Sequence, residues 1–350
     1  MLSQEIERLV WAAAILLCAL TIMFLYLVIK KALEIRKEKH IQKYMDHIHG
    51  TIYGYLYQDK KSRHLLPDSS VKFTAIERLL TNYSTVLEGE GKEKITQLAD
   101  ELFKSRYESI LRRNKWSSRM NVLYKIDGFR MTVLNEVLKE MIKDYKITKD
   151  EKLIIFRCLA YSNNDSLSAL FQYISVPFSV LEYRSIINRM DDIAFGQIVS
   201  DYHLYPENLQ LAIIDIIGIQ KKLDFVHFLE GQLDDKQFEI RIRSMKAIGE
   251  VGFLSDSLIV ERFAQSQQWE ERLMAAKVIG KTRVRNGLDV LDILIKDSSW
   301  MVRAQAAKAF LSYTDGLERL YDIRFTSDDP FARDMASEWI ERGIEDGYSY

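Results

Sequence analysis

The hydrophobic pattern of the chain opens with one long apolar run. Residues 9–29, LVWAAAILLCALTIMFLYLVI, contain no charged side chain. Because a helix rises about 1.5 Å per residue, a run of this length can cross a hydrocarbon core of about 30 Å. Trp11 and Tyr26 lie near its two ends, where amphipathic aromatic rings favour the membrane interface. The pattern therefore predicts a transmembrane helix over residues 9–29, preceded by a short extracytoplasmic segment, residues 1–8.

A cleaved signal peptide is the competing interpretation of this run. Such a peptide has a basic first segment, a shorter apolar core and small residues at the cleavage site. Here Glu5, Glu7 and Arg8 precede the run, and no A-x-A-like site follows it. These features favour an uncleaved anchor.

Basic residues follow the apolar run directly: Lys30, Lys31, Arg36, Lys37, Lys39 and Lys43. Because positive charge is retained on the cytoplasmic side of a membrane, we expect a single-pass cell-membrane protein whose C-terminal domain is cytoplasmic. The same stretch, with Leu33 and Ile35 within it, could also rest on anionic lipid headgroups. The alternative is that these lysines and arginines only set the topology.

Beyond the anchor the pattern is helical almost throughout. It predicts that the membrane helix continues from residue 30 to about residue 57, and that a loop containing Pro67 covers residues 58–70. Two helices are expected over residues 71–87 and 92–113, separated by a breaker at Gly89 and Gly91. Residues 30–115 are therefore a basic juxtamembrane helix followed either by a membrane-proximal cap or by degenerate repeats. No strand-period alternation persists anywhere in the sequence.

From residue 116 onwards the pattern recurs at a fixed interval. Three arginines are separated by equal steps of thirty-one positions, each with an aromatic residue three positions before it and a lysine five positions after it. The sets are Phe238, Arg241 and Lys246; Trp269, Arg272 and Lys277; and Trp300, Arg303 and Lys308. Trp116 and Arg119 repeat the aromatic–arginine pair about five periods before Trp269 and Arg272. Self-similarity at such a period is typical of stacked helical repeats, so the sequence predicts an all-α solenoid over residues 116–350.

We expect about eight helix pairs in this region, with the weakest register near Ile147 and Phe178. Gly218, Gly249 and Gly280 recur at the same interval as the arginines. We predict that each of these glycines closes its helix in the left-handed conformation, which a residue without a Cβ adopts readily.

The motif Asp297-x-x-Trp300-x-Val302-Arg303-x-x-Ala306-Ala307-x-Ala309-Phe310 resembles a HEAT repeat of the short bacterial type, which is also found in phycobilisome-lyase-like repeats. The resemblance is strong over residues 208–312, weaker over residues 116–206 and absent over residues 1–115. It implies that Asp297 and Arg303, and by register Arg241 and Arg272, tie adjacent units together. It also implies scaffolding, adaptor or regulatory binding and names no reaction.

Motifs for catalysis, cofactors and metals are absent from the sequence, which has no P-loop, no Rossmann fingerprint and no HExxH. His47 and His49 would point about 200° apart on a helix, so they would not face one metal ion. Cys18 and Cys158 form no metal-binding spacing. We therefore expect no enzyme, no cofactor and no metal.

Charge is spread unevenly, although the formal net charge of the chain is only -1. Residues 30–64 hold nine Lys and Arg against four Asp and Glu, whereas residues 315–350 hold ten acids against four arginines. The balanced total gives no argument for nucleic-acid binding, so we expect no nucleic-acid partner. The asymmetry instead indicates different neighbours at the two ends.

One basic cluster is a candidate binding site: Lys104, Arg106, Arg112, Arg113 and Lys115. Tyr107 and Trp116 are interleaved with it, a mixture that could hold phosphate, a phospholipid headgroup or an acidic partner. The alternative is a solvated helix face that ends in the repeat arginine Arg119.

Taken together, the patterns predict a membrane-anchored cytoplasmic scaffold or adaptor that binds a membrane protein partner. The architecture alone suggests an integral-membrane glycosyltransferase or polysaccharide-synthesis complex as that partner. A ligand-binding sensor or a lyase-like enzyme built on the same array is the alternative.

Overall fold

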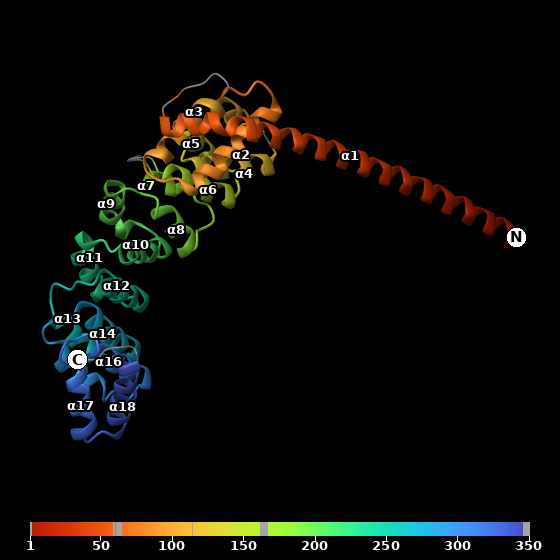
Figure 1. The fold of residues 1–350 in the computed structure, drawn as a ribbon. Coiled ribbons are helices and arrows are strands. Elements are labelled where there is room, and N and C mark those ends of the chain that lie inside the picture. Colours follow the sequence, from red (N-terminus) through yellow and green to blue (C-terminus); the bar gives the residue numbers. More distant parts are fainter. Residues whose placement is uncertain (1, 59, 61–64, 114, 162–166, 346–350) are drawn as a thin grey trace. The chain divides into compact units, whose positions relative to one another are not determined.

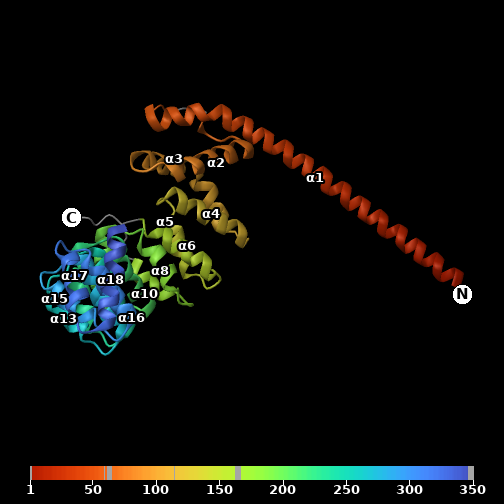
Figure 2. The same ribbon diagram turned by 60° about the horizontal axis from the view of Figure 1, so that its bottom comes forward.

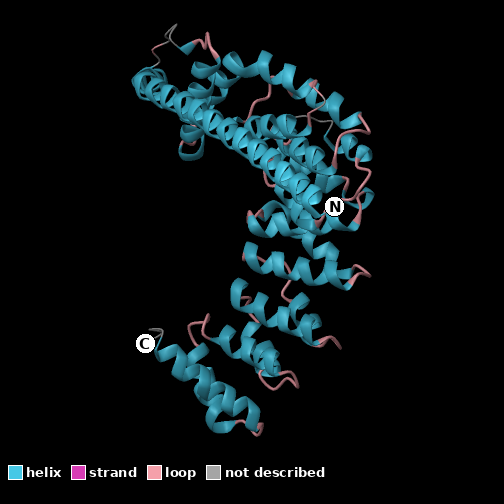
Figure 3. Ribbon diagram, turned by 90° about the vertical axis from the view of Figure 1, so that its right-hand side faces the viewer, coloured by secondary structure: helices cyan, strands magenta, loops and turns pink. Residues whose placement is uncertain are grey.

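The computed structural model describes residues 2–58, 60, 65–113, 115–161 and 167–345. Over these ranges the fold is all-α, with eighteen α-helices, several short 3-10 turns and no strand (Figure 3). The chain divides into two compact units, Met1–Ser162 and Asn163–Tyr350. The all-α prediction is therefore confirmed for the described residues.

The first unit begins with a single uninterrupted helix, α1 (Leu2–Gln58). By its length and composition alone, this helix is long enough and apolar enough to cross a membrane, and it contains the predicted span. Every side chain from Trp11 to His40 is exposed, with Trp11 at 65% and Tyr26 at 62%. In Figures 1 and 2, the N-terminal part of α1 projects away from the other helices of its unit. The prediction that the helix of the apolar run continues without a break to about residue 57 is confirmed.

The C-terminal part of α1 packs on the rest of its unit. Ile41, Ile48 and Ile52 are at most 2% exposed, and their spacing of seven and four positions places them on one face of the helix. This face contacts α2 (Ser70–Val86) and α3 (Glu90–Leu111). One helix therefore has an exposed segment from Trp11 to His40 and a packed segment from Ile41 onwards.

The predicted helix pair after the loop corresponds to α2 and α3. Ser69 caps α2 by accepting a hydrogen bond from the backbone N–H of Lys72, and Gly89, with φ of 56°, separates the two helices. Both pack on α4 (Trp116–Phe129), which is followed by α5 (Asn135–Lys143) and contacts α6 (Lys149–Leu159).

Two series of helices alternate along the second unit. We call them the longer and the shorter series, although the two helices of the first pair and of the last pair are of nearly equal length. The longer series is α8 (Val180–Ile187), α10 (Glu207–Ile219), α12 (Phe238–Val251), α14 (Trp269–Thr282), α16 (Trp300–Phe310) and α18 (Pro330–Glu345). Each helix of this series packs on the next (Figure 3). The shorter helices between them are α9 (Asp192–Ser200), α11 (Val226–Gly231), α13 (Leu258–Ala264), α15 (Gly287–Leu294) and α17 (Gly316–Thr326).

The sequence predicts about eight helix pairs from residue 116 onwards, and the described residues contain six pairs in which both helices exceed a single turn: α4 with α5, and the five from α8 and α9 to α16 and α17. The helix after α6 is α7 (Leu167–Leu170), a single short turn, and α18 has no second helix among the described residues. Five pairs, from α8 and α9 to α16 and α17, are regular.

The prediction that Gly218, Gly249 and Gly280 close their helices is wrong. All three lie within helices, and the positive φ angles occur three positions later, at Lys221, Gly252 and Arg283. The reason is packing. A Cβ added at Gly218 would lie 2.9 Å from the Cα of Ala247, and one at Gly280 would lie 3.0 Å from the Cβ of Ala309. Gly218 and Gly280 therefore allow neighbouring helices of the longer series to approach closely, whereas a Cβ at Gly249 would make an ordinary contact of 3.6 Å with Val278.

Candidate functional site

The arginine of each aromatic-x-x-Arg step folds back onto its own loop. In every case Nη1 donates a hydrogen bond to the backbone carbonyl six positions upstream. The pairs are Arg119 to Arg113 (2.9 Å), Arg241 to Asp235 (2.9 Å), Arg272 to Ser266 (2.8 Å) and Arg303 to Asp297 (2.8 Å). This bond fixes the turn that leads into the helix, so the arginine has a structural role at all four positions.

Three of these arginines also reach a buried carboxylate that follows in the chain. The Nε atom of Arg119 donates to Glu151 at 2.7 Å, and that of Arg241 donates to Glu271 at 2.7 Å. Arg272 makes two bonds to Asp297, of 2.5 and 2.9 Å. The carboxylate side chains are 0%, 8% and 7% exposed, respectively. Each pair ties the helix that carries the arginine to the second helix after it, or to the loop that leads into that helix.

The carboxylate of Asp297 therefore pairs with Arg272 and not with Arg303, whose bond is to the Asp297 backbone. The guanidinium of Arg303 lies 5.0 Å from the ring centroid of Phe331, and its buried Nε has no hydrogen-bond partner among the described residues. The ladder of arginine–carboxylate pairs ends at this position, where α18 supplies an aromatic ring instead of an acid.

The aromatic half of the motif behaves differently from the arginine half. Trp116, Phe238, Trp269 and Trp300 are 47%, 38%, 36% and 58% exposed. The Nε1 atom of Trp116 donates to the Thr148 hydroxyl at 3.2 Å. The arginines are held within the array, whereas more than a third of the surface of each of these aromatic residues stays exposed.

The five residues of the basic cluster differ in their contacts. The Arg106 guanidinium lies 4.1 Å from the centroid of the Phe73 ring, and Arg112 pairs with Glu108 at 3.0 Å. Lys104, Arg113 and Lys115 are exposed. Tyr107, which the sequence places among them, is buried and donates to Glu77 at 2.6 Å. Two of the five cations are thus held by neighbouring side chains, which favours the solvated-face interpretation for them.

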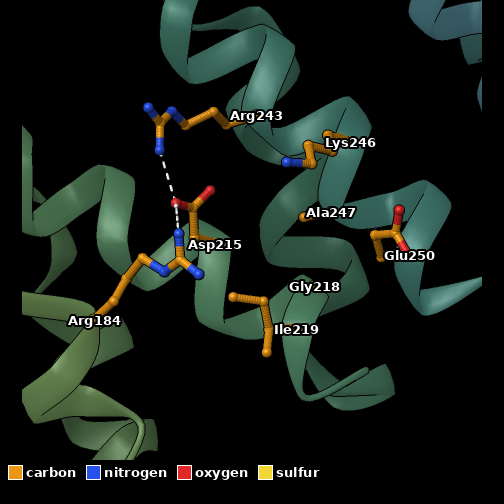
Figure 4. A pocket seen from close by; sticks show the side chains of 8 residues that line it. All are labelled: Arg184, Asp215, Gly218, Ile219, Arg243, Lys246, Ala247 and Glu250. Carbon is orange, nitrogen blue, oxygen red and sulfur yellow. Dashed lines mark hydrogen bonds and ion pairs between the residues drawn. The ribbon is translucent and has the colours of Figure 1, made fainter. Parts of the chain in front are cut away.

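A charged cavity of about 110 Å³ on the second unit is absent from the sequence analysis (Figure 4). Asp215 of α10 lies between Arg184 of α8, at 3.5 Å, and Arg243 of α12, at 2.7 Å. Arg243 is also paired with Glu239, at 2.7 Å. The cavity is further lined by one more cation and one more acid, Lys246 and Glu250. The lining thus holds three cations and two acids, and Glu239, outside the lining, takes up part of the charge of Arg243. The ion pairs of Asp215 join three successive helices of the longer series.

One signal in the sequence could have found this cluster. Arg184, Asp215 and Lys246 are separated by the same equal steps as the repeat arginines, so they occupy the same place on successive helices. Opposite charges at neighbouring places attract one another, which favours a contact between units.

Asp100 is a carboxyl group of the first unit with an altered acidity. Burial raises its pKa to about 6, despite the nearby Lys104, and its Oδ1 is buried without a hydrogen-bond partner among the described residues. A raised pKa means that ionisation opposes folding. The penalty is absent below pH ~4, grows as pH rises, and is complete above pH ~6.

Replacing Asp100 by asparagine is therefore expected to raise the free energy of unfolding at neutral pH by about 1 kcal/mol, after allowance for partial exposure. The gain should vanish near pH ~4, where the wild-type carboxyl is already protonated. Thermal unfolding at several pH values measures this. Glu101→Gln, an exposed neighbour on the same helix, is the control and should change little; an equal gain there would contradict the explanation.

Metal-ligating geometry does not occur among the residues that the structure describes, where no three His, Cys, Asp or Glu side chains could hold an ion together. His49 instead shares a hydrogen bond of 2.9 Å with the Tyr83 hydroxyl. Neither Cys18, which is exposed, nor Cys158, which is buried, takes part in a disulfide bond.

Comparison with known proteins adds little to this description. No family model matches the chain, and no curated protein matches it. Among solved structures, one engineered protein has 14% sequence identity and a TM-score of 0.26 over 78% of this chain and 80% of that one. A second engineered protein has 15% identity and a TM-score of 0.23 over 77% of this chain and 97% of that one. Similarity this low supports no conclusion about fold or function.

Proposed function

We propose that this protein is a membrane-anchored scaffold of HEAT-like helical repeats, which binds a membrane protein partner from the cytoplasmic side. The observation that carries the proposal is the continuity of α1. One helix contains the apolar run and, from Ile41 onwards, packs into the folded unit. An anchor joined to a domain by an unbroken helix, and not by a flexible linker, restricts where that domain can lie.

The length of the exposed segment sets the height of the scaffold. From Ile29, the end of the apolar run, to Ile41, the first buried residue, the helix rises about 18 Å. The intervening side chains are exposed and include Lys30 and Lys31. These charges would keep this part of α1 at the cytoplasmic headgroups, where anionic lipid attracts them.

The helical series supplies the binding surface. Helices of the longer series pack in order, and buried arginine–carboxylate pairs connect them, which supports a solenoid of the kind expected from the HEAT-like motif. Such arrays present long surfaces, and membrane tethering raises their effective concentration near a partner in the same bilayer. An integral-membrane glycosyltransferase of a polysaccharide-synthesis complex is the partner class that this architecture suggests.

Exchange of the anchor tests this mechanism. Replacing residues 9–29 by an unrelated transmembrane helix should leave partner capture intact in pull-downs from native membranes, because the anchor only tethers. Deleting residues 1–40 should weaken capture by about 10²–10⁴-fold, because the local concentration is lost. If the exchanged anchor captures nothing while the wild type does, the partner recognises the membrane helix itself and the scaffold mechanism is wrong.

A further inference from the structure

The aromatic residues that begin α12, α14 and α16 form a periodic exposed stripe. Phe238, Trp269 and Trp300 are each the first residue of their helix, are separated by equal steps in the sequence, and are 38%, 36% and 58% exposed. Met301, at 51% exposure, extends the apolar surface on α16. Single exposed apolar residues are ordinary, but aromatic residues at the same place on three successive packed helices form a connected surface.

The spacing of this stripe follows from helix packing. Successive helices of the series are in direct contact, and packed helix axes lie about 8–10 Å apart. Gly280 allows close approach of α14 and α16, since a Cβ there would lie 3.0 Å from the Cβ of Ala309. An aromatic side chain is thus presented about every 8–10 Å.

This interval distinguishes between the conformations that a bound segment could have. A polyproline II helix has three residues per turn and rises about 3.1 Å per residue, so it repeats about every 9 Å. A β-strand presents one side every ~6.7 Å, and an α-helix repeats every ~5.4 Å. Only the polyproline II repeat matches the interval between neighbouring aromatic residues without drifting out of register.

The charge near the C-terminal end of the stripe indicates which charged residues a bound segment should carry. Residues 315–350 hold ten acids against four arginines, and Asp328 and Asp334 are exposed carboxylate residues near the start of α18. Since α18 packs on α16, the stripe ends beside negative charge. A segment that follows the stripe to this end would be favoured by basic residues.

We propose that the Phe238–Trp269–Trp300 stripe binds an extended, basic, proline-rich segment of a partner protein, with one proline or other apolar residue at every third position against each aromatic residue. This rests on the proposed scaffold function and names the chemistry of the partner segment. Proline-rich segments bind aromatic-lined surfaces in this way because their preformed conformation lowers the entropic cost of binding.

The test uses the full chain in mild detergent and a labelled peptide of five Pro-Pro-Lys triplets, roughly 15 residues, with affinity measured by fluorescence anisotropy. The double variant Trp269→Ala, Trp300→Ala should bind at least about tenfold more weakly than the wild type, because two aromatic contacts are lost. The variant Trp269→Phe, Trp300→Phe should retain most of the affinity. Phe325→Ala, which removes a still more exposed aromatic ring from α17 (76% exposed), is the control outside the stripe and should bind like the wild type.

Three results would overturn the proposal: no binding of the Pro-Pro-Lys peptide, equal binding by the alanine double variant, or equally tight binding of a flexible Gly-Ser-Lys peptide of the same charge. Circular dichroism of each variant shows whether the fold is kept. Pull-downs from native membranes separate the two proposals. If the alanine double variant captures the same membrane partner as the wild type, the scaffold function stands and the stripe is not its binding surface. If the wild type captures no partner, the scaffold function fails whatever the peptide does.

Discussion

Replacing Arg272 by alanine is expected to lower the free energy of unfolding by about 3–5 kcal/mol. The side chain is 15% exposed and makes two bonds to Asp297, which is 7% exposed. Removing it leaves a buried carboxylate without its counter-charge and frees the loop carbonyl of Ser266, which Arg272 also holds. Loss of one partner of a buried pair costs far more than the pair contributes, because the remaining charge stays desolvated.

Denaturant unfolding of the full chain in detergent, followed by circular dichroism, measures this effect. Arg262→Ala is the control, because its pair with Asp234 has side chains 53% and 73% exposed, and exposed pairs contribute about 0–1 kcal/mol. Similar losses in the two variants would show that burial of the Arg272–Asp297 pair has no energetic importance.

The same comparison has a defined pH dependence. Burial alone would raise the pKa of Asp297, but hydrogen bonds and charge from Arg272 outweigh it and hold the pKa below its usual value. A lowered pKa in the folded state contributes stability that is present above pH ~4 and is lost as pH falls through the folded-state value. The difference between wild type and Arg272→Ala should therefore shrink below pH ~4.

Alanine substitutions at two of the periodic glycines are expected to give opposite signs. Gly218→Ala should lower the free energy of unfolding by about 1–2 kcal/mol, because its Cβ would lie 2.9 Å from the Ala247 backbone. Gly249→Ala should raise it by about 0.5–1 kcal/mol, because its nearest contact would be an ordinary 3.6 Å to Val278 and alanine favours a helix interior. In the first variant the new methyl group would overlap the next helix, whereas in the second variant it would not.

Gly252→Ala provides the comparison for a true left-handed cap. A Cβ at Gly252 would have open space around it, with nothing within 4 Å. The substitution should still lower the free energy of unfolding by about 1 kcal/mol, because the φ of 82° is unfavourable for alanine. The same unfolding measurement applies to all three variants. Uniform losses at Gly218 and Gly249 would support the cap interpretation that the structure contradicts.

These glycines also show where sequence reasoning ended. Their periodic spacing predicted that they occupy equivalent places, and all three do lie within helices of the longer series. The periodic spacing does not say whether a glycine ends its helix or lets the next helix approach. That depends on whether the helix ends at the glycine or three positions later, and on which residues of the next helix pack against it. The long apolar helix, by contrast, needs only composition and length, and α1 runs from Leu2 to Gln58 as one element.

The partners of the repeat arginines were less accessible from sequence for a similar reason. Their carboxylates follow at 32, 30 and 25 residues, as Glu151, Glu271 and Asp297. Glu151 and Glu271 lie within helices, whereas Asp297 lies in the loop before α16. In all three cases the carboxylate still accepts a hydrogen bond from the Nε atom of the repeat arginine. The exposure of Trp269 and Trp300 could not be predicted either, because the first residue of a helix lies at the boundary between packed and open surface.

The mass of the complex extracted from native membranes in mild detergent tests the central claim most directly. Native mass spectrometry should find the chain of 41.0 kDa in fixed ratio with a second polypeptide that itself crosses the membrane. Finding only the chain, alone or in multiples of itself, would contradict the claim that it is a membrane-held binding scaffold.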